Sequence, residues 1–130
     1  MRESAFWGLI KAAMHRVCPV GMHFSRIENI SGSGVPDVNM CKDGREMWIE
    51  LKIARGNQVL FQPSQLAWIT QHVACGGNVF VLVRKNNEMR LYLGADAVHL
   101  AKKLDVAPVF VTQKPFRWRE LIDLLVELSK

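Results

Sequence analysis

Hydrophobic residues recur at two different periods along the chain, and these periods predict where its helices and strands lie. From residue 3 to residue 17, apolar side chains recur every three or four positions, as at Phe6, Ile10 and Ala13. This spacing predicts an amphipathic helix with one face toward a core. A first strand is expected to follow over Met22 to Ile30.

The middle of the chain predicts a β-hairpin. Asp43-Gly44 separates two apolar segments, and glycine tolerates the positive φ angle that a tight turn requires. Successive side chains of a strand point to opposite faces of its sheet. On the returning strand, one face therefore carries apolar residues and the other polar or aromatic ones: Met47, Ile49, Leu51 and Ile53 against Glu46, Trp48, Glu50 and Lys52.

The remainder of the chain alternates between helical and extended patterns. A loop over residues 54–61 leads to a helix that starts near Pro63, with Gln62 or Ser64 near its cap, and ends at Gly76-Gly77. The continuous apolar run from Asn78 to Lys85 is typical of a central strand buried on both faces. The later elements expected are a strand over 89–93, a helix over 95–104, an extended segment over 106–112 and a helix over 116–130. This order predicts a single α/β domain over residues 1–130, with a central mixed β-sheet flanked by helices.

Composition favours a globular protein with a polyanionic partner. Hydrophobic residues make up 49% of the chain and charged residues 22%, as in ordinary globular domains. The 17 Lys and Arg residues outnumber the 12 Asp and Glu residues, and such an excess favours nucleic acid as a partner. The three cysteines lie far apart without Cys-x-x-Cys spacing, which favours a reduced, cytoplasmic location. No apolar run approaches membrane-spanning length, so no membrane partner is expected.

The hairpin also brings together residues that could bind a metal ion and take part in catalysis. Asp37 and Glu50 could hold Mg²⁺, which prefers oxygen ligands and is usually bound by one or two carboxylates together with substrate phosphates. The backbone carbonyl of Leu51 could add an oxygen, and Lys52 could orient a water molecule or stabilise developing negative charge. The alternative is an exposed strand edge with ordinary charges, because Glu-x-Lys by itself occurs in many proteins.

The combination of motifs is more specific than any one of them. The chain contains Gly34-Val35-Pro36-Asp37, then Ile49-Glu50-Leu51-Lys52, then Gly56, and then Gln65-Leu66-Ala67-Trp68. This order resembles the PD-(D/E)XK nuclease superfamily, most closely the VRR-NUC group of small phage and bacterial nucleases, with archaeal-type Holliday junction resolvases as near relatives. The family loop before the helix often reads Ser-Pro-x-Gln, whereas this chain has Gln62-Pro63-Ser64-Gln65, which keeps the glutamine.

The resemblance implies a restriction-endonuclease-like core and a Mg²⁺-dependent deoxyribonuclease, with Mn²⁺ able to substitute. It assigns Asp37 and Glu50 to the metal and Lys52 to the attacking water. Gln65, on the following helix, could hydrogen-bond near Lys52 or the scissile phosphate. The products implied are 5′-phosphate and 3′-hydroxyl ends.

One further carboxylate remains open between alternatives. An early helical glutamate that reaches the active site is implied by the resemblance, which makes Glu3 a candidate metal ligand. A glutamate in a first helical turn also complements the helix dipole, and this explanation of Glu3 is equally acceptable. Glu28, close in sequence to the loop that carries Asp37, is a competing candidate.

The expected substrate is DNA, with branched DNA such as a Holliday junction leading. One metal site cuts one strand and a junction needs two symmetric cuts, so a homodimer is expected, with apolar surface around Phe110, Phe116 and Trp118. Arg55 lies in a loop expected to face DNA, and without a recognition domain the contacts should follow backbone and shape. Two alternatives are a catalytically silent nucleic-acid-binding domain of the same fold and an interaction module that docks through Trp118.

Overall fold

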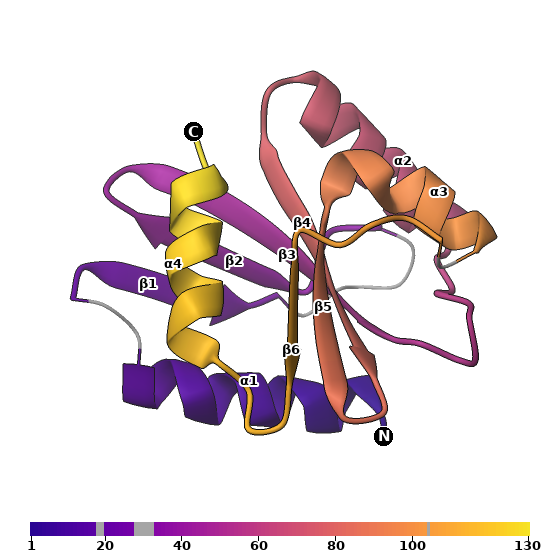
Figure 1. The fold of residues 1–130 in the computed structure, drawn as a ribbon. Coiled ribbons are helices and arrows are strands. Elements are labelled where there is room, and N and C mark those ends of the chain that lie inside the picture. The colour runs from indigo at the N-terminus through magenta and orange to yellow at the C-terminus, as the bar shows by residue number, and fades with distance from the viewer. Residues whose placement is uncertain (18–19, 28–32, 104) are drawn as a thin grey trace.

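The computed structural model describes residues 1–17, 20–27, 33–103 and 105–130, and these residues form one six-stranded sheet with helices on both faces (Figure 1). The elements, in chain order, are α1 (Glu3–Val17), β1 (Met22–Arg26), β2 (Val38–Lys42), β3 (Arg45–Ile53), α2 (Pro63–Ala74), β4 (Asn78–Lys85), β5 (Glu88–Leu93), a 3₁₀ turn (Gly94–Asp96), α3 (Ala97–Lys102), β6 (Phe110–Gln113) and α4 (Trp118–Leu128). The strands lie side by side in their order along the chain. This arrangement confirms the predicted α/β class with a mixed sheet.

Strands β3 and β4 are the parallel pair that makes the sheet mixed. Leu51 of β3 lies opposite Leu82 of β4, while every other neighbouring pair of these strands is antiparallel. Parallel neighbours need a crossover connection, and α2 supplies it between β3 and β4. The crossover covers one face of β3, so the second half of this strand is buried on both sides.

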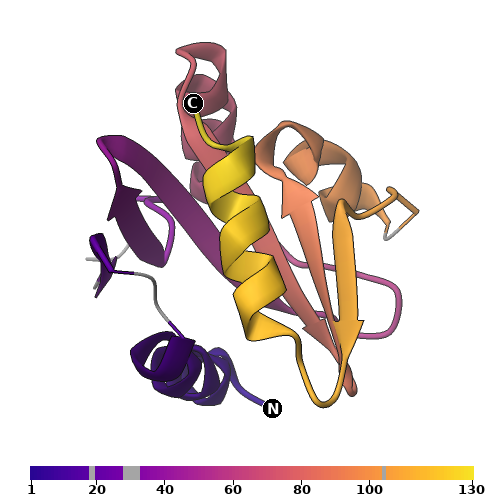
Figure 2. The ribbon, with the colours of Figure 1, turned by 60° about the vertical axis from the view of Figure 1, so that its left-hand side comes forward.

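Helices α1 and α4 cover one face of the sheet (Figure 2). Phe6 and Ile10 of α1 and Leu121 and Leu125 of α4 are buried there among the apolar side chains of β2 to β5. The amphipathic patterns of both terminal helices therefore predicted core packing correctly.

Helices α2 and α3 cover the other face, where Ile69 and Leu100 pack against Val81 and its neighbours. Glu50 and Lys52 of β3 lie on this same side of the sheet and are only 1% and 5% exposed. The alternative of an exposed strand edge with ordinary surface charges is therefore wrong. A strand whose polar face is covered by a helix must bury its charged side chains.

The hairpin turn has the geometry that its sequence predicts. Asp43 and Gly44 both have positive φ angles, of 52° and 76°, as a two-residue turn of the primed type requires. The turn fixes the register in which Val38 lies opposite Ile49. This register brings Asp37, the residue before β2, alongside the second half of β3.

The remaining boundaries differ modestly from those expected. The described part of β1 ends at Arg26, and residues 28–30 of the predicted strand lie outside the described residues. Strand β6 begins at Phe110 rather than near residue 106, because Pro108 has no N–H for ladder pairing. No helix of the described chain is long and apolar enough to cross a membrane.

Candidate active site

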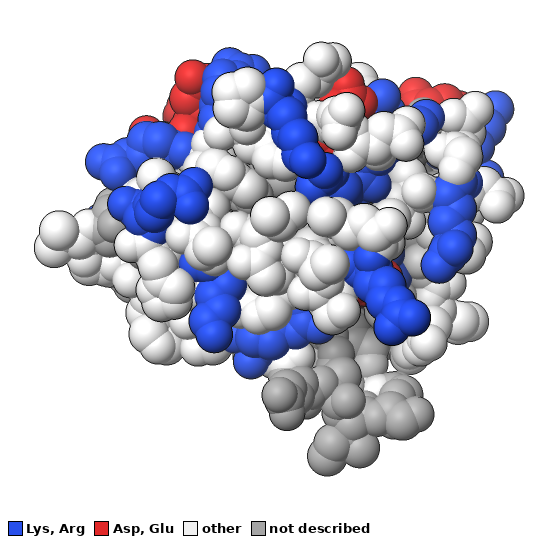
Figure 3. All heavy atoms as spheres, turned by 90° about the horizontal axis from the view of Figure 1, so that it is seen from below, with Lys and Arg blue, Asp and Glu red and all other residues white. Residues whose placement is uncertain are grey.

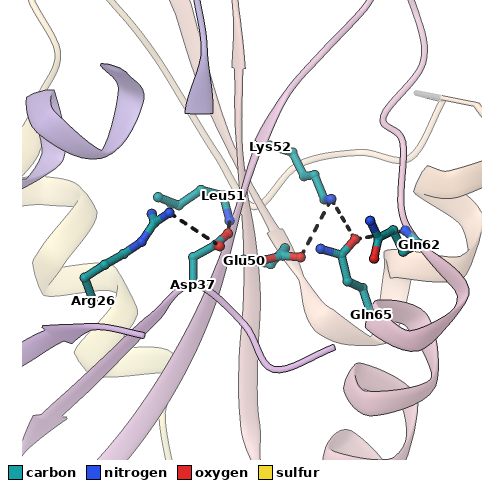
Figure 4. A network of polar contacts seen from close by, with 7 residues as sticks. All are labelled: Arg26, Asp37, Glu50, Leu51, Lys52, Gln62 and Gln65. Carbon is teal, nitrogen blue, oxygen red and sulfur yellow. Dashed lines mark hydrogen bonds and ion pairs between the residues drawn. The ribbon is translucent and has the colours of Figure 1, made fainter. Parts of the chain in front are cut away.

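Asp37 is fixed by hydrogen bonds to two neighbouring segments. Its carbonyl oxygen accepts a bond of 2.7 Å from the amide of Ile27, and its carboxylate Oδ2 accepts one of 2.8 Å from the amide of Leu51 (Figure 4). The second bond ties the loop before β2 directly to the strand that carries Glu50. Of the predicted site residues, Asp37, Glu50 and Leu51 therefore lie together.

Glu50 is the most unusual side chain of the site. It is buried, and neither of its carboxyl oxygens receives a hydrogen bond from the described residues. Burial and the adjoining Asp37 carboxyl group, which acts through hydrogen bonding and charge, together raise the pKa of Glu50 to about 9, while the charge of Lys52 opposes the increase. Both effects disfavour the ionised form, because a buried charge loses its hydration and two carboxylates repel. A bound cation would remove both penalties.

Lys52 is held beside Glu50 by a set of contacts from α2 and the preceding loop. Its Nζ donates a hydrogen bond of 2.8 Å to Oε1 of Gln65 and lies 3.7 Å from Oε2 of Glu50 (Figure 4). The same nitrogen lies 4.8 Å from the centre of the Phe61 ring. Gln65 is itself fixed, since its Oε1 also accepts a bond of 2.9 Å from the amide of Gln62 at the helix N-terminus. The departure from the family loop sequence therefore leaves the glutamine in place.

Glu3 faces the same site from the start of α1. It lines a pocket of about 290 Å³ together with Arg2, Lys52 and Arg55. Burial raises the pKa of Glu3, the charge of Asp37 adds to the increase, and the charge of Lys52 opposes it. These influences place Glu3 within electrostatic reach of the carboxylate pair. Glu28, the competing candidate, lies outside the described residues.

The donor set fits a hard divalent cation. Asp37 and Glu50 offer two carboxylates, and the Glu50 oxygens receive no hydrogen bond from the described residues. Mg²⁺ commonly binds one or two carboxylates and completes its shell with water and substrate phosphate. The described residues contain no group of three or more His, Cys, Asp or Glu side chains placed to enclose an ion. The Leu51 carbonyl remains a predicted ligand.

Two contacts of the site were not expected from the sequence. Arg26 of β1 places its Nη2 3.9 Å from Oδ1 of Asp37, and no local signal in β1 indicates this contact. Gly34 has a φ of +73°, and a β-carbon there would lie 2.1 Å from the carbonyl oxygen of Ser64. The Gly-Val-Pro-Asp motif could have revealed the second contact, because a glycine at that point often marks a close backbone approach.

Two other residues singled out from the sequence, Trp68 and Arg55, lie outside the carboxylate pair. Trp68 stacks on His72 with ring centres 4.4 Å apart and contacts Trp48 edge to face, so it packs within the protein as expected. Arg55 is exposed in the loop after β3, where its backbone pairs with that of Gln58.

Figure 3 shows many Lys and Arg side chains and few acids on the face seen from below, as a polyanion-binding surface requires.

Comparisons with known proteins identify the fold. No protein-family model and no curated protein matches the chain. Among solved structures, the chain is similar to Hjc, a Holliday junction resolvase from the archaeal hyperthermophile Archaeoglobus fulgidus, with 13% sequence identity and a TM-score of 0.54. The similarity covers 91% of this chain and 92% of that chain. The expected fold, a mixed sheet flanked by helices, is thereby confirmed as that of this resolvase, whereas the narrower likeness to the VRR-NUC group stays a prediction.

Proposed function

We propose that the protein is a Mg²⁺-dependent DNA endonuclease of the PD-(D/E)XK type, allied to the small VRR-NUC nucleases. The observation that carries the proposal is the buried Glu50 carboxyl group, which has no hydrogen-bond donor among the described residues and adjoins Asp37 and Lys52. A buried polar group without a hydrogen-bond partner destabilises the folded state by roughly 1–3 kcal/mol or more. Such a cost is understandable where a ligand completes the site, and the fold similarity supports a nuclease as the class.

The proposed mechanism divides the work among few residues. When bound, Mg²⁺ would stabilise negative charge on the phosphate and favour an ionised water as nucleophile. Asp37 and Glu50 would hold the ion, with Glu3 adding negative charge nearby from the start of α1. Lys52 uses one of its three N–H donors on Gln65, which leaves donors that can orient the attacking water. Cleavage would leave 5′-phosphate and 3′-hydroxyl ends.

The direct test is cleavage of labelled duplex, flap, splayed-arm and four-way-junction DNA with Mg²⁺, with Mn²⁺ and with EDTA. We expect cleavage in both metals, none in EDTA, and a preference for branched substrates. The Glu50→Gln variant is the matched control, because it keeps the shape of the side chain and removes its charge. DNA binding without cleavage of any substrate in either metal would refute the enzyme and favour a silent binding domain.

We further propose that the active form is a homodimer. One chain offers one candidate metal site, and two-fold pairing would present two sites to the two strands of a branched DNA. Phe116 and Trp118, in mutual edge-to-face contact, line a largely apolar groove with Leu9 and Pro115. Sedimentation at micromolar concentration should give the mass of two chains. A monomer that nicks junction strands independently would refute the dimer and leave the nuclease proposal intact.

A further inference from the structure

A second pocket adjoins the candidate active site, between α1 and the edge strand β1. Its volume is about 550 Å³, within the range of pockets that bind small ligands. Trp7, Lys11 and His15 line it from α1, four residues apart and hence on one face of the helix. Phe24 and Arg26 line it from β1, and none of the described residues that line it is an Asp or Glu.

The aromatic side chains of this pocket form a fixed platform. The Phe24 ring meets Trp7 edge to face with centres 6.3 Å apart, and meets His15 in the same way at 5.5 Å. Trp7 and Phe24 each pack partly against the core and remain half-buried. One side of each ring is therefore anchored, while ring surface remains at the pocket.

Arg26 connects the pocket to the active site. Its guanidinium lies 5.6 Å from the centre of the Trp7 ring and 3.9 Å from the carboxylate of Asp37. The Nη1 atom of Arg26 is buried and has no acceptor among the described residues. A donor of this kind suits an anionic oxygen, and its position places that anion next to the phosphate that Asp37 would help to cleave.

We propose that this pocket binds an unpaired nucleotide of the DNA strand that is cut, adjacent to the scissile phosphate. The inference rests on the proposed nuclease function and refines its substrate. Proteins bind single strands by combining cations for the backbone with aromatic rings on which bases stack, and the pocket offers both. A base inside an intact duplex is already stacked between its neighbours, so it cannot present a face to Trp7. The pocket therefore selects branch points where bases beside the cut are unpaired.

The test uses the catalytically silenced Glu50→Gln protein and two probes that carry 2-aminopurine beside the expected cut. One probe is a splayed-arm DNA and the other a fully paired duplex of the same length. Binding of the splayed arm should quench the 2-aminopurine, and adding Trp7→Leu should weaken that binding by about 5- to 150-fold, the usual range for one stacked base. Duplex binding should change by less than about twofold, and Trp7→Phe should retain most of the affinity.

Lys11→Gln provides a second variant without risk to the fold, since Lys11 is exposed on α1. It should weaken splayed-arm binding and reduce the salt dependence by about one phosphate contact, whereas Lys102→Gln, on the exposed end of α3, should do neither. Equal losses on both probes, or no quenching, would overturn the inference. If the wild-type protein cleaves nothing but Trp7-dependent quenching persists, the pocket stands and the nuclease proposal falls.

Discussion

Replacing Glu50 with glutamine changes how the stability of the metal-free protein depends on pH. The pKa of Glu50 is raised from an ordinary value of 4.5 to about 9. Between these two values, the folded protein keeps a proton that the unfolded chain has released. The contribution of Glu50 to stability is therefore fully present below pH 4.5 and is lost as the pH rises toward 9, because the unfolded state binds fewer protons at this group than the folded state.

The size of this pH effect on stability follows from the binding of one proton. The free energy of unfolding should fall by at most about 1.4 kcal/mol per pH unit through this window. Between pH 6 and pH 8, the limit is thus about 2.7 kcal/mol. Glu50→Gln cannot release the proton, so its stability should lack this decline. Glu3 titrates in both proteins, and its charge is the smallest of the influences on Glu50, so the difference between the two proteins removes most of its contribution.

Urea unfolding in EDTA at pH 5, 6, 7 and 8 measures the effect. The stability of Glu50→Gln relative to wild type should rise steadily with pH. Glu46→Gln is the matched control, because Glu46 is exposed on the same strand, and it should follow wild type throughout. A constant difference between Glu50→Gln and wild type across this pH range would refute a protonated Glu50.

The Glu50→Gln variant also tests whether Glu50 binds the metal. Mg²⁺ binding needs the ionised carboxylate and should release a proton, so the affinity of wild type for Mg²⁺ should increase from pH 6 to pH 8. Saturating Mg²⁺ at about 100 times its Kd should stabilise wild type by about 2.7 kcal/mol and leave Glu50→Gln unchanged. DNA cleavage should be lost in the variant while DNA binding survives.

Four other substitutions test the remaining parts of the site. Asp37→Asn should reduce single-turnover cleavage by several orders of magnitude, since metal stabilisation is worth several kcal/mol, and should preserve DNA binding by fluorescence anisotropy; near-wild-type turnover would remove Asp37 from the site. Lys52→Ala should lose cleavage yet still bind Mg²⁺ in calorimetry, and Gln65→Ala should lose less cleavage activity than Lys52→Ala. If Lys52→Ala instead abolished Mg²⁺ binding and kept cleavage at high Mg²⁺, Lys52 would not act on the attacking water. Gly34→Ala should lower the free energy of unfolding in urea by at least about 1–2 kcal/mol, because the residue has a positive φ angle. Gly8→Ala is the control: Gly8 lies in open space on α1, so this substitution should leave stability unchanged or raise it. Equal effects of the two substitutions would contradict the close backbone approach at Gly34.

The sequence predicted the elements whose signals are local. Helix α1 has the bounds that its periodicity indicated, and the hairpin turn has the positive φ angles that Asp43-Gly44 favours. The apolar run from Asn78 to Lys85 forms the strand predicted to be central. In each case, neighbouring residues determine the conformation, so their order along the chain is sufficient.

What the sequence could not predict depends on distant segments. The alternation along β3 is typical of a strand with one face open to solvent, yet α2 covers that face. Only the parallel pairing with β4 and the crossover between them reveal that Glu50 and Lys52 are buried. The contact of Arg26 with Asp37 likewise joins residues that no local motif connects.

Burial of Glu50 bears on the alternative of a catalytically silent domain. A carboxyl group taken out of water without a hydrogen-bond donor destabilises the fold, and replacing such a group by an apolar one of similar shape is often neutral or stabilising. A domain that only bound DNA would therefore lose nothing by exchanging Glu50 for an apolar residue, because Glu50 does not reach the surface. Glu50 makes physical sense where its carboxylate, together with that of Asp37, would hold a cation that favours the approach of a DNA phosphate.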